Sequence, residues 1–142
     1  MKGGVTLSTV LVVEVVTPNF RLIEVNLEKE GFKVVRASDL DQVQEKRSSP
    51  ELVQQLSLVI VDIILRGVES GFEICRLLRA SPETSHLPIF VLTSRHDIAA
   101  RKLACELGIN AFATKPYHPR DLLAVVKKLS YRSIPDQPQG AD

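Results

Sequence analysis

The sequence predicts an α/β domain built on a doubly wound, five-stranded parallel sheet. Short aliphatic runs alternate along the chain with segments of helical periodicity, an alternation typical of βαβ units. The runs at 58–62 (LVIVD) and 87–92 (LPIFVL) are almost wholly apolar, as expected of strands that are buried on both faces of a parallel sheet. A chain of 142 residues, 44% hydrophobic and 25% charged, is long enough to form one such domain.

The first half of the sheet is expected from three segments. Residues 7–13 (LSTVLVV) form the first predicted strand. Residues 19–30 repeat apolar side chains at helical spacing, and Gly31 is placed to end that helix in its C′ position. Residues 32–37 (FKVVRA) are rich in valine and predict a second, short strand.

The next helix and the third strand follow the same alternation. Ser38 or Asp39 suits the N-cap of a helix that buries its few apolar residues. Pro50 ends any continuous helix, but it fits the first turn of a new short helix reaching about Gln55. The run at 58–62 is then the third strand.

The second half of the chain repeats the pattern with clear stop signals. An amphipathic helix is predicted at 71–79 and is broken by a Ser-Pro pair before the fourth strand at 87–92. A further helix at 97–107 is stopped by a glycine. The fifth strand is predicted at 109–114, and the last helix runs from about 119 to 129. Five strands are thus expected to alternate with five helices.

Composition narrows the class of protein. We expect a flexible N-terminus at 1–6, a single domain at 7–131, and a disordered tail or linker at 132–142, which is rich in proline and glutamine. The net charge of +1 gives no indication of direct nucleic-acid binding. No apolar run reaches the length of a membrane span, and the N-terminus lacks a signal-peptide pattern. These features predict a cytoplasmic location with no membrane partner.

Four of the predicted strands end at a side chain that can react or bind a ligand: Glu14, Asp62, Thr93 and Lys115. In a sheet of order 2-1-3-4-5 the first and third strands are neighbours, and ligands bind beyond the carboxyl ends of the strands. Each residue alone has a structural explanation, as a turn, a helix-end charge or a solvated lysine. Together they suit phosphoryl chemistry, with a carboxylate nucleophile, a carboxylate-held metal, and a hydroxyl and a lysine on the phosphoryl oxygens.

These motifs resemble the receiver domain of two-component response regulators, of the CheY-like superfamily and the flavodoxin-like (βα)5 fold. The resemblance covers about residues 8–131, with a few extra residues around Pro50. It rests on LVVE at 11–14, LVIVDIILRG at 58–67, GFEICRLLR at 71–79, PIFVLTSR at 88–95, LGINAFATKP at 107–116 and PRDLLAVVKKL at 119–129.

The resemblance implies a role for each strand-end residue. Asp62 would be the phosphoacceptor, and Lys115 would pair with the phosphoryl group next to a cis peptide bond to Pro116. Thr93 would donate its hydroxyl to a phosphoryl oxygen on activation. Phe112 stands at the position of the family's switch aromatic, although a plain core phenylalanine is an equal alternative.

The resemblance also implies a Mg²⁺ site, and here the sequence departs from the family. Glu14, Asp62 and the backbone carbonyl of Ile64 would be ligands, but Val15 stands where the family has a second acidic residue. Mg²⁺ requires oxygen ligands, and valine supplies none. We therefore expect a weakened Mg²⁺ site in an atypical acidic pocket. Whether Glu14 compensates for the missing carboxylate stays open.

Two functions follow from the resemblance, and neither is enzymatic. The first is a phospho-accepting receiver that takes its phosphoryl group from a sensor histidine kinase or a phosphotransfer protein. It would contact a downstream protein through the face at Asp97–Leu129, with a homodimer as a further possibility. The alternative, favoured by Val15, is a pseudo-receiver that acts as a phosphorylation-independent interaction module. An unrelated binder of an anionic ligand is the weakest reading, because EVVTP at 14–18 lacks a phosphate-binding glycine loop.

Overall fold

The computed structural model describes residues 8–65, 71–94 and 98–132, with residues 131 and 132 described by their backbone alone. The predicted flexible N-terminus at 1–6 lies outside these residues, as do residues 133–142 of the tail predicted at 132–142, whereas residue 132 belongs to the last helix. The described strands are β1 (Thr9–Val13), β2 (Lys33–Ala37), β3 (Leu56–Asp62), β4 (Ile89–Thr93) and β5 (Ala111–Thr114). They form one sheet of order β2-β1-β3-β4-β5 in which every neighbouring pair is parallel. This confirms the predicted fold class and strand order.

The described part of the chain contains six helices rather than the five expected to alternate with the strands. They are α1 (Thr17–Glu28), α2 (Leu40–Arg47), α3 (Pro50–Gln55), α4 (Gly71–Ala80), α5 (Ile98–Glu106) and α6 (Pro119–Arg132). The additional element is α3, the short helix anticipated at Pro50. Ser49 starts it by accepting a hydrogen bond from the Leu52 N–H at 3.3 Å. The connection between β2 and β3 is therefore split into two helices.

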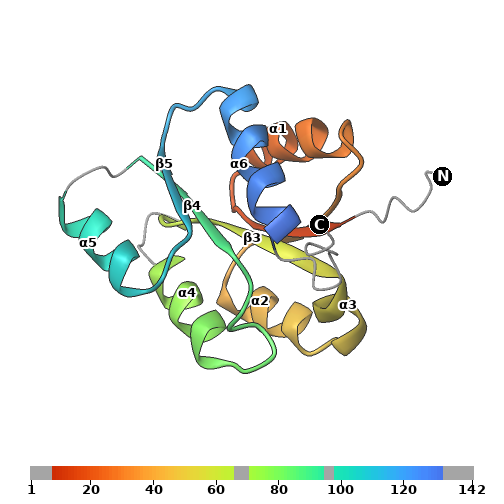
Figure 1. Cartoon of the computed structure of the whole chain (residues 1–142), viewed down its shortest axis with the longest axis vertical. Helices are drawn as coiled ribbons and strands as arrows, with labels where there is room; N and C mark the ends of the chain where they lie inside the picture. Colours follow the sequence, from red (N-terminus) through yellow and green to blue (C-terminus); the bar gives the residue numbers. More distant parts are fainter. Residues whose placement is uncertain (1–7, 66–70, 95–97, 133–142) are drawn as a thin grey trace, which may run out of the picture.

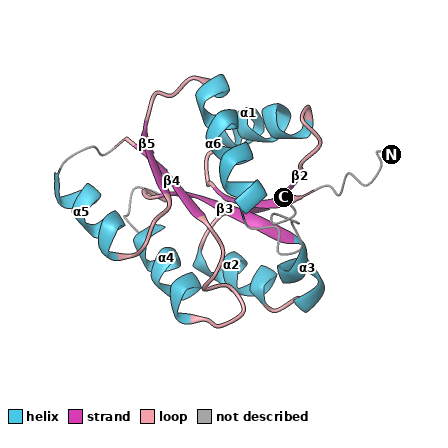
Figure 2. Cartoon of the chain, viewed as in Figure 1, coloured by secondary structure: helices cyan, strands magenta, loops and turns pink. Residues whose placement is uncertain are grey.

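The helices cover both faces of the sheet (Figures 1 and 2). One face packs against α1 and α6, through a buried cluster that includes Phe20, Ile23, Leu122 and Val126. The other face packs against α2, α4 and α5. Alternate residues of the central strands supply the two clusters, so that Ile60 of β3 faces α1 and α6 while Val59 and Val61 face the opposite layer. This two-sided burial explains why the strand runs are continuously apolar.

Helix ends depart from the predictions by a few residues. Helix α1 begins at Thr17, two residues before the predicted start, because Pro18 is accepted within its first turn. Gly31 and Gly108 have positive φ angles of 94° and 68° after α1 and α5, as expected of residues that end helices. Asp39, rather than Ser38, caps α2 by accepting from the Gln42 N–H at 2.9 Å.

Two further observations concern membrane-spanning helices and the cysteines. Within the described residues, no helix has both the length and the apolar content needed to cross a bilayer. Both cysteines are free: Cys75 is buried in α4, while Cys105 is exposed on α5.

Candidate functional site

The strand order brings the predicted polar residues to one edge of the sheet. Strand β1 lies next to β3 in the sheet. Glu14 follows β1 and Asp62 is the last residue of β3, so the two residues stand at the ends of adjacent strands. Thr93 ends β4, the next strand across, and Lys115 follows β5. Glu14, Asp62 and Thr93 are buried, with exposed fractions of 1%, 6% and 0%. Three chemically active groups thus lie beneath the surface at the carboxyl ends of the central strands.

The carboxylate of Asp62 is held from two sides. The Nζ atom of Lys115 lies 2.6 Å from its Oδ2 atom. The backbone N–H of Ile64 donates to its Oδ1 atom at 3.0 Å. A buried carboxylate requires such partners, since its desolvation would otherwise be costly.

The carboxylate of Glu14 faces the same lysine. Lys115 Nζ lies 3.6 Å from Glu14 Oε1, and the backbone N–H of Val16 donates to Glu14 Oε2 at 3.1 Å. The lysine ammonium therefore interacts with both carboxylates. It neutralises part of the repulsion between the two acids, of which Asp62 is close enough to Glu14 to contribute to the raised pKa of Glu14.

The pKa values of Glu14 and Lys115 are both raised, but for different reasons. Burial raises the pKa of Glu14, and the nearby Asp62 charge adds to that rise against the Val16 hydrogen bond and Lys115. Burial acts to lower the pKa of Lys115, but the hydrogen bond to Asp62 and the charges of both carboxylates together raise it. Lys115 is therefore held in its charged form, which favours contact with anions.

Thr93 and Lys115 are also joined through the backbone. The Lys115 N–H donates to the Thr93 carbonyl at 2.8 Å, and the Lys115–Pro116 peptide bond is cis, as the sequence analysis anticipated. These features place the lysine directly beside the end of β4.

The position of Val15 determines how well the pocket fits a divalent cation. Val15 is half-buried and packs against an apolar cluster, so it contributes no ligand. The described residues contain no group of three or more His, Cys, Asp or Glu side chains placed to hold a metal. Mg²⁺ in proteins is nevertheless commonly bound by one or two carboxylates and completed by water and phosphate oxygens. The buried pair Glu14 and Asp62 fits that smaller donor set.

Phe112 lies on β5 in a half-buried position. It packs against the cluster beneath α4 and α5, and the guanidinium carbon of Arg101 lies 5.0 Å from its ring centroid. A cavity of about 240 Å³ adjoins the ring and is lined also by Ala104 and Cys105 of α5. Phe112 is thus neither fully buried nor fully exposed.

Sequence reasoning missed the structural importance of Gly71. It was read only as the start of a helix, whereas its backbone N–H donates to the Ile63 carbonyl at 2.9 Å. A Cβ atom at this position would lie 2.5 Å from the Cα atom of Ile63 and would also collide with the Asp62 carbonyl. Gly71 therefore allows α4 to approach the end of β3. No local pattern signals this approach, because it depends on a tertiary contact.

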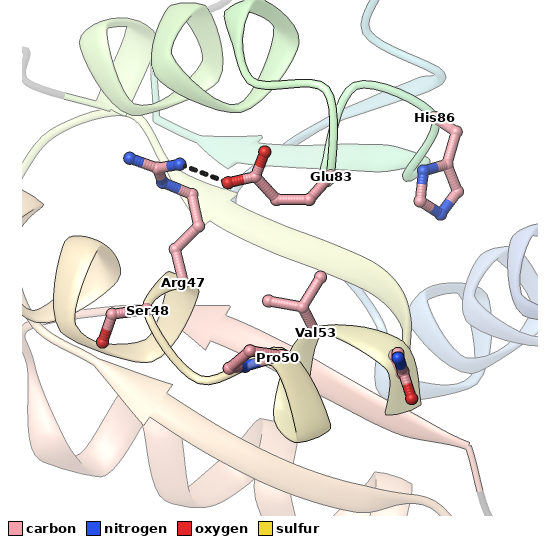
Figure 3. A pocket seen from close by; sticks show the side chains of 7 residues that line it. Arg47, Ser48, Pro50, Val53, Glu83 and His86 are labelled. Atoms are coloured by element: carbon pink, nitrogen blue, oxygen red, sulfur yellow. Dashed lines mark hydrogen bonds and ion pairs between the residues drawn. The ribbon is translucent and has the colours of Figure 1, made fainter.

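A larger cavity, drawn from close by in Figure 3, lies between α3 and the loop before β4, at the amino ends of β3 and β4. Its volume is about 580 Å³, and its lining comes from α2, α3 and the loop before β4. Arg47 and Glu83 form an ion pair of 2.8 Å beside it, while Val53 of α3 supplies apolar surface. None of the residues at the carboxyl ends of the strands lines this cavity. It is thus separate from the acidic pocket.

Comparisons with known proteins place the chain in a family. The family model for the response regulator receiver domain matches residues 10–127. The chain is 36% identical over 117 residues to the phosphate regulon transcriptional regulatory protein PhoB of Rhizobium meliloti, covering 81% of this chain and 48% of that protein. It is 35% identical over 124 residues to the transcriptional regulatory protein GltR of Pseudomonas aeruginosa, covering 85% and 48%.

A solved structure gives the same picture. A putative response regulator from Chloroflexus aurantiacus superposes with a TM-score of 0.76 at 28% identity, covering 88% of this chain and 98% of that one. The chain spans about half the length of the curated relatives named above.

Proposed function

This chain belongs to the response regulator receiver domain family of two-component signalling, and we propose that Asp62 is its phosphoryl acceptor. The observation that carries the proposal is the 2.6 Å contact between Lys115 Nζ and Asp62 Oδ2 in a buried pocket. A carboxylate in this position can act as a nucleophile. The ammonium beside it can neutralise the negative charge that an incoming phosphoryl group brings. The donor would be a sensor histidine kinase or a phosphotransfer protein.

The transfer follows from the positions of the side chains. A carboxylate oxygen of Asp62 attacks phosphorus while the bond to the donor nitrogen breaks, and the electron pair leaves with that nitrogen. Lys115 then pairs with a phosphoryl oxygen instead of with Asp62 alone. The Thr93 hydroxyl donates to a second phosphoryl oxygen.

Receiver domains generally bind Mg²⁺ in an acidic pocket, and here Glu14, Asp62 and the Ile64 carbonyl would hold the ion. When bound, the ion neutralises phosphoryl oxygens that would otherwise be repelled by the carboxylates. Because Val15 contributes no ligand, we expect weaker Mg²⁺ binding and slower transfer than in a pocket with a second acid.

The output of the switch would be a protein contact. Phe112 lies on β5, the edge strand next to β4, while Thr93 ends β4 and Lys115 follows β5. The helices α5 and α6 precede and follow β5 in the chain and complete the face. Movement of Thr93 would change the position of the Phe112 ring. That change would alter the surface that contacts a downstream partner or a second copy of the chain. Of the predicted face Asp97–Leu129, Asp97 lies outside the described residues.

A second candidate function is supported by Val15. A pseudo-receiver would use the same fold as a docking module without accepting a phosphoryl group. In that case the 2.6 Å Lys115–Asp62 pair would be a permanent structural contact rather than the resting state of a switch.

Phosphorylation with acetyl phosphate separates the two functions. Wild type, Asp62→Asn and Val15→Asp are incubated with and without millimolar Mg²⁺, and the intact mass and hydroxylamine sensitivity of each protein are measured. We expect wild type to gain one phosphoryl group slowly, Val15→Asp to gain it faster, and Asp62→Asn to gain none. Labelling of Val15→Asp alone would support the pseudo-receiver. Labelling of Asp62→Asn at the wild-type rate would show that another residue is the acceptor.

A further inference from the structure

The side chain of Arg36 holds the turn that follows β1. Arg36 is the fourth residue of β2 and pairs with Val12 of β1 in the sheet. Its Nε atom donates to the Glu14 carbonyl at 3.1 Å, and its Nη2 atom donates to the Val15 carbonyl at 2.9 Å. A planar guanidinium thus binds two successive backbone carbonyls of the turn from the neighbouring strand.

The same guanidinium reaches the beginning of α1. Its Nη2 atom also lies 3.2 Å from the Thr17 hydroxyl, and its central carbon lies 4.8 Å from the Phe20 ring centroid. Cation–π and hydrogen-bond contacts in one half-buried side chain restrict it to a single orientation. Arg36 therefore links β2, the turn and the first two turns of α1.

This turn lacks the usual means of stabilisation. The N-cap position of α1 is occupied by Val16, which has no side-chain acceptor. The Val16 N–H instead donates to the Glu14 carboxylate at 3.1 Å. The backbone of the turn and the carboxylate of Glu14 are consequently coupled: where the turn lies decides where the carboxylate points.

We propose that Arg36 is a positioning residue of the acidic pocket, acting through the backbone of the Glu14–Thr17 turn to hold the Glu14 carboxylate against Lys115 and Asp62. Its hydrogen bonds among the described residues go to carbonyls and a hydroxyl, so its action on the pocket is indirect. Val15 makes this role more important, because Glu14 is the only carboxylate that this turn supplies. The inference rests on the proposed function insofar as the pocket binds Mg²⁺.

The test uses Arg36→Met, which keeps the apolar stem, and Arg36→Lys, which keeps the charge but loses the two parallel N–H groups. Arg21→Met is the matched control, since Arg21 is a 70% exposed arginine of α1 whose ion pair with Glu24 is a distant 3.6 Å. Two quantities are measured by NMR in each protein: the chemical shift and exchange rate of the Val16 amide, and the apparent Mg²⁺ dissociation constant from a titration.

We expect Arg36→Met to accelerate exchange of the Val16 amide and to raise the Mg²⁺ dissociation constant about tenfold, in the range found for residues that orient metal ligands. Arg36→Lys should show the same changes, because one ammonium cannot bind two carbonyls with the geometry of a guanidinium. Arg21→Met should match wild type in both measurements. In a Glu14→Gln background, Arg36→Met should cause no further loss of Mg²⁺ affinity.

The proposal is overturned if both Arg36 variants lose thermal stability while the Val16 amide and the Mg²⁺ titration stay as in wild type. It is also overturned if Arg36→Met lowers Mg²⁺ affinity equally with and without the Glu14 carboxylate. If Arg36→Met does not fold, Arg36→Lys provides the same comparison. A wild type that binds Mg²⁺ but takes no phosphoryl group would contradict the proposed function alone. If the wild type binds no Mg²⁺, the exchange rate and chemical shift of the Val16 amide test the proposal on their own.

Discussion

Lys115 Nζ contacts Asp62 Oδ2 at 2.6 Å, although the two residues are 53 positions apart in the chain. The same ammonium lies 3.6 Å from Glu14, so one cation serves two buried carboxylates. Under the proposed function, a phosphoryl group on Asp62 would share this ammonium with the two carboxylates. Several properties of the domain follow from this arrangement and from the contacts around it.

Glu14→Gln should make the stability of the domain less dependent on pH. Burial, reinforced by Asp62, raises the pKa of Glu14 above its ordinary value of 4.5. The folded state therefore binds this proton more tightly than the unfolded state. That contribution is fully present below pH 4.5 and is lost as the pH rises through the raised pKa. We expect Glu14→Gln to melt at a higher temperature than wild type at pH 7, with the difference shrinking as the pH falls toward 4.5.

The measurement is thermal unfolding between pH 4.5 and 8 in buffer with a chelator. The other groups that shift the pKa of Glu14 are the Val16 N–H, Asp62 and Lys115. Lys115 titrates above this window because its pKa is raised from 10.5, so its contribution is constant. A melting-temperature difference that does not vary with pH would contradict the expectation.

Gly71→Ala should destabilise the domain and disturb the pocket together. The added Cβ would meet the backbone of Asp62 and Ile63 at distances that only a backbone shift can relieve. Overpacking of this kind costs about 1–3 kcal/mol. Chemical denaturation measures that loss, and the acetyl phosphate reaction reports whether Asp62 has moved. Wild-type stability in Gly71→Ala would show that α4 does not approach β3 so closely.

Arg79→Met should be far more damaging than Arg76→Met in the same helix. Arg79 donates to the carbonyls of four residues and to the Asn110 side chain, tying α4 to the loops before β4 and β5. The four residues are Ser85, Leu87, Leu107 and Gly108. We expect a loss of about 2–3 kcal/mol in the free energy of unfolding, because charge-assisted hydrogen bonds to part-buried carbonyls disappear.

Arg76 is the control for that substitution. It is 48% exposed and pairs only with Glu73 among its described ion pairs, so its removal should cost well under about 1 kcal/mol. Arg79→Lys should recover little of the loss, since one ammonium cannot reach acceptors on both loops. Equal unfolding midpoints for Arg79→Met and Arg76→Met would contradict this account.

The two cysteines should react very differently with a thiol reagent. Burial raises the pKa of Cys75 to about 12, with nearby Arg79 and Arg76 opposing that rise only in part, so almost no thiolate forms at pH 8. Cys105 is exposed. Ellman's reagent should label one thiol per folded chain and two in denaturant. Rapid labelling of both thiols in the folded protein would mean that α4 opens readily, and Cys105→Ser should then retain a reactive thiol.

Much of the fold could be predicted from local patterns. The strand positions, a cap at Ser38 or Asp39 and the new helix at Pro50 follow from short-range chemistry, whereas the order of the sheet follows from the doubly wound fold class. Helix α1 starts at Thr17 and not at residue 19 as predicted, because a proline is compatible with the first turn of a helix. Cys105 lies on α5 and is exposed, which depends on how the helix packs and not on the local sequence.

The strand-end residues and the gap at Val15 were determined by the sequence alone. A carboxylate after a buried strand, a Lys-Pro pair after another, and a valine beside Glu14 are visible without coordinates. Only the tertiary structure decided that Lys115 contacts both carboxylates and that Arg36 holds the turn carrying Glu14. The physical reason is that these contacts join neighbouring strands far apart in the chain. Their lengths depend on how the sheet and helices pack, which no local pattern of residues records.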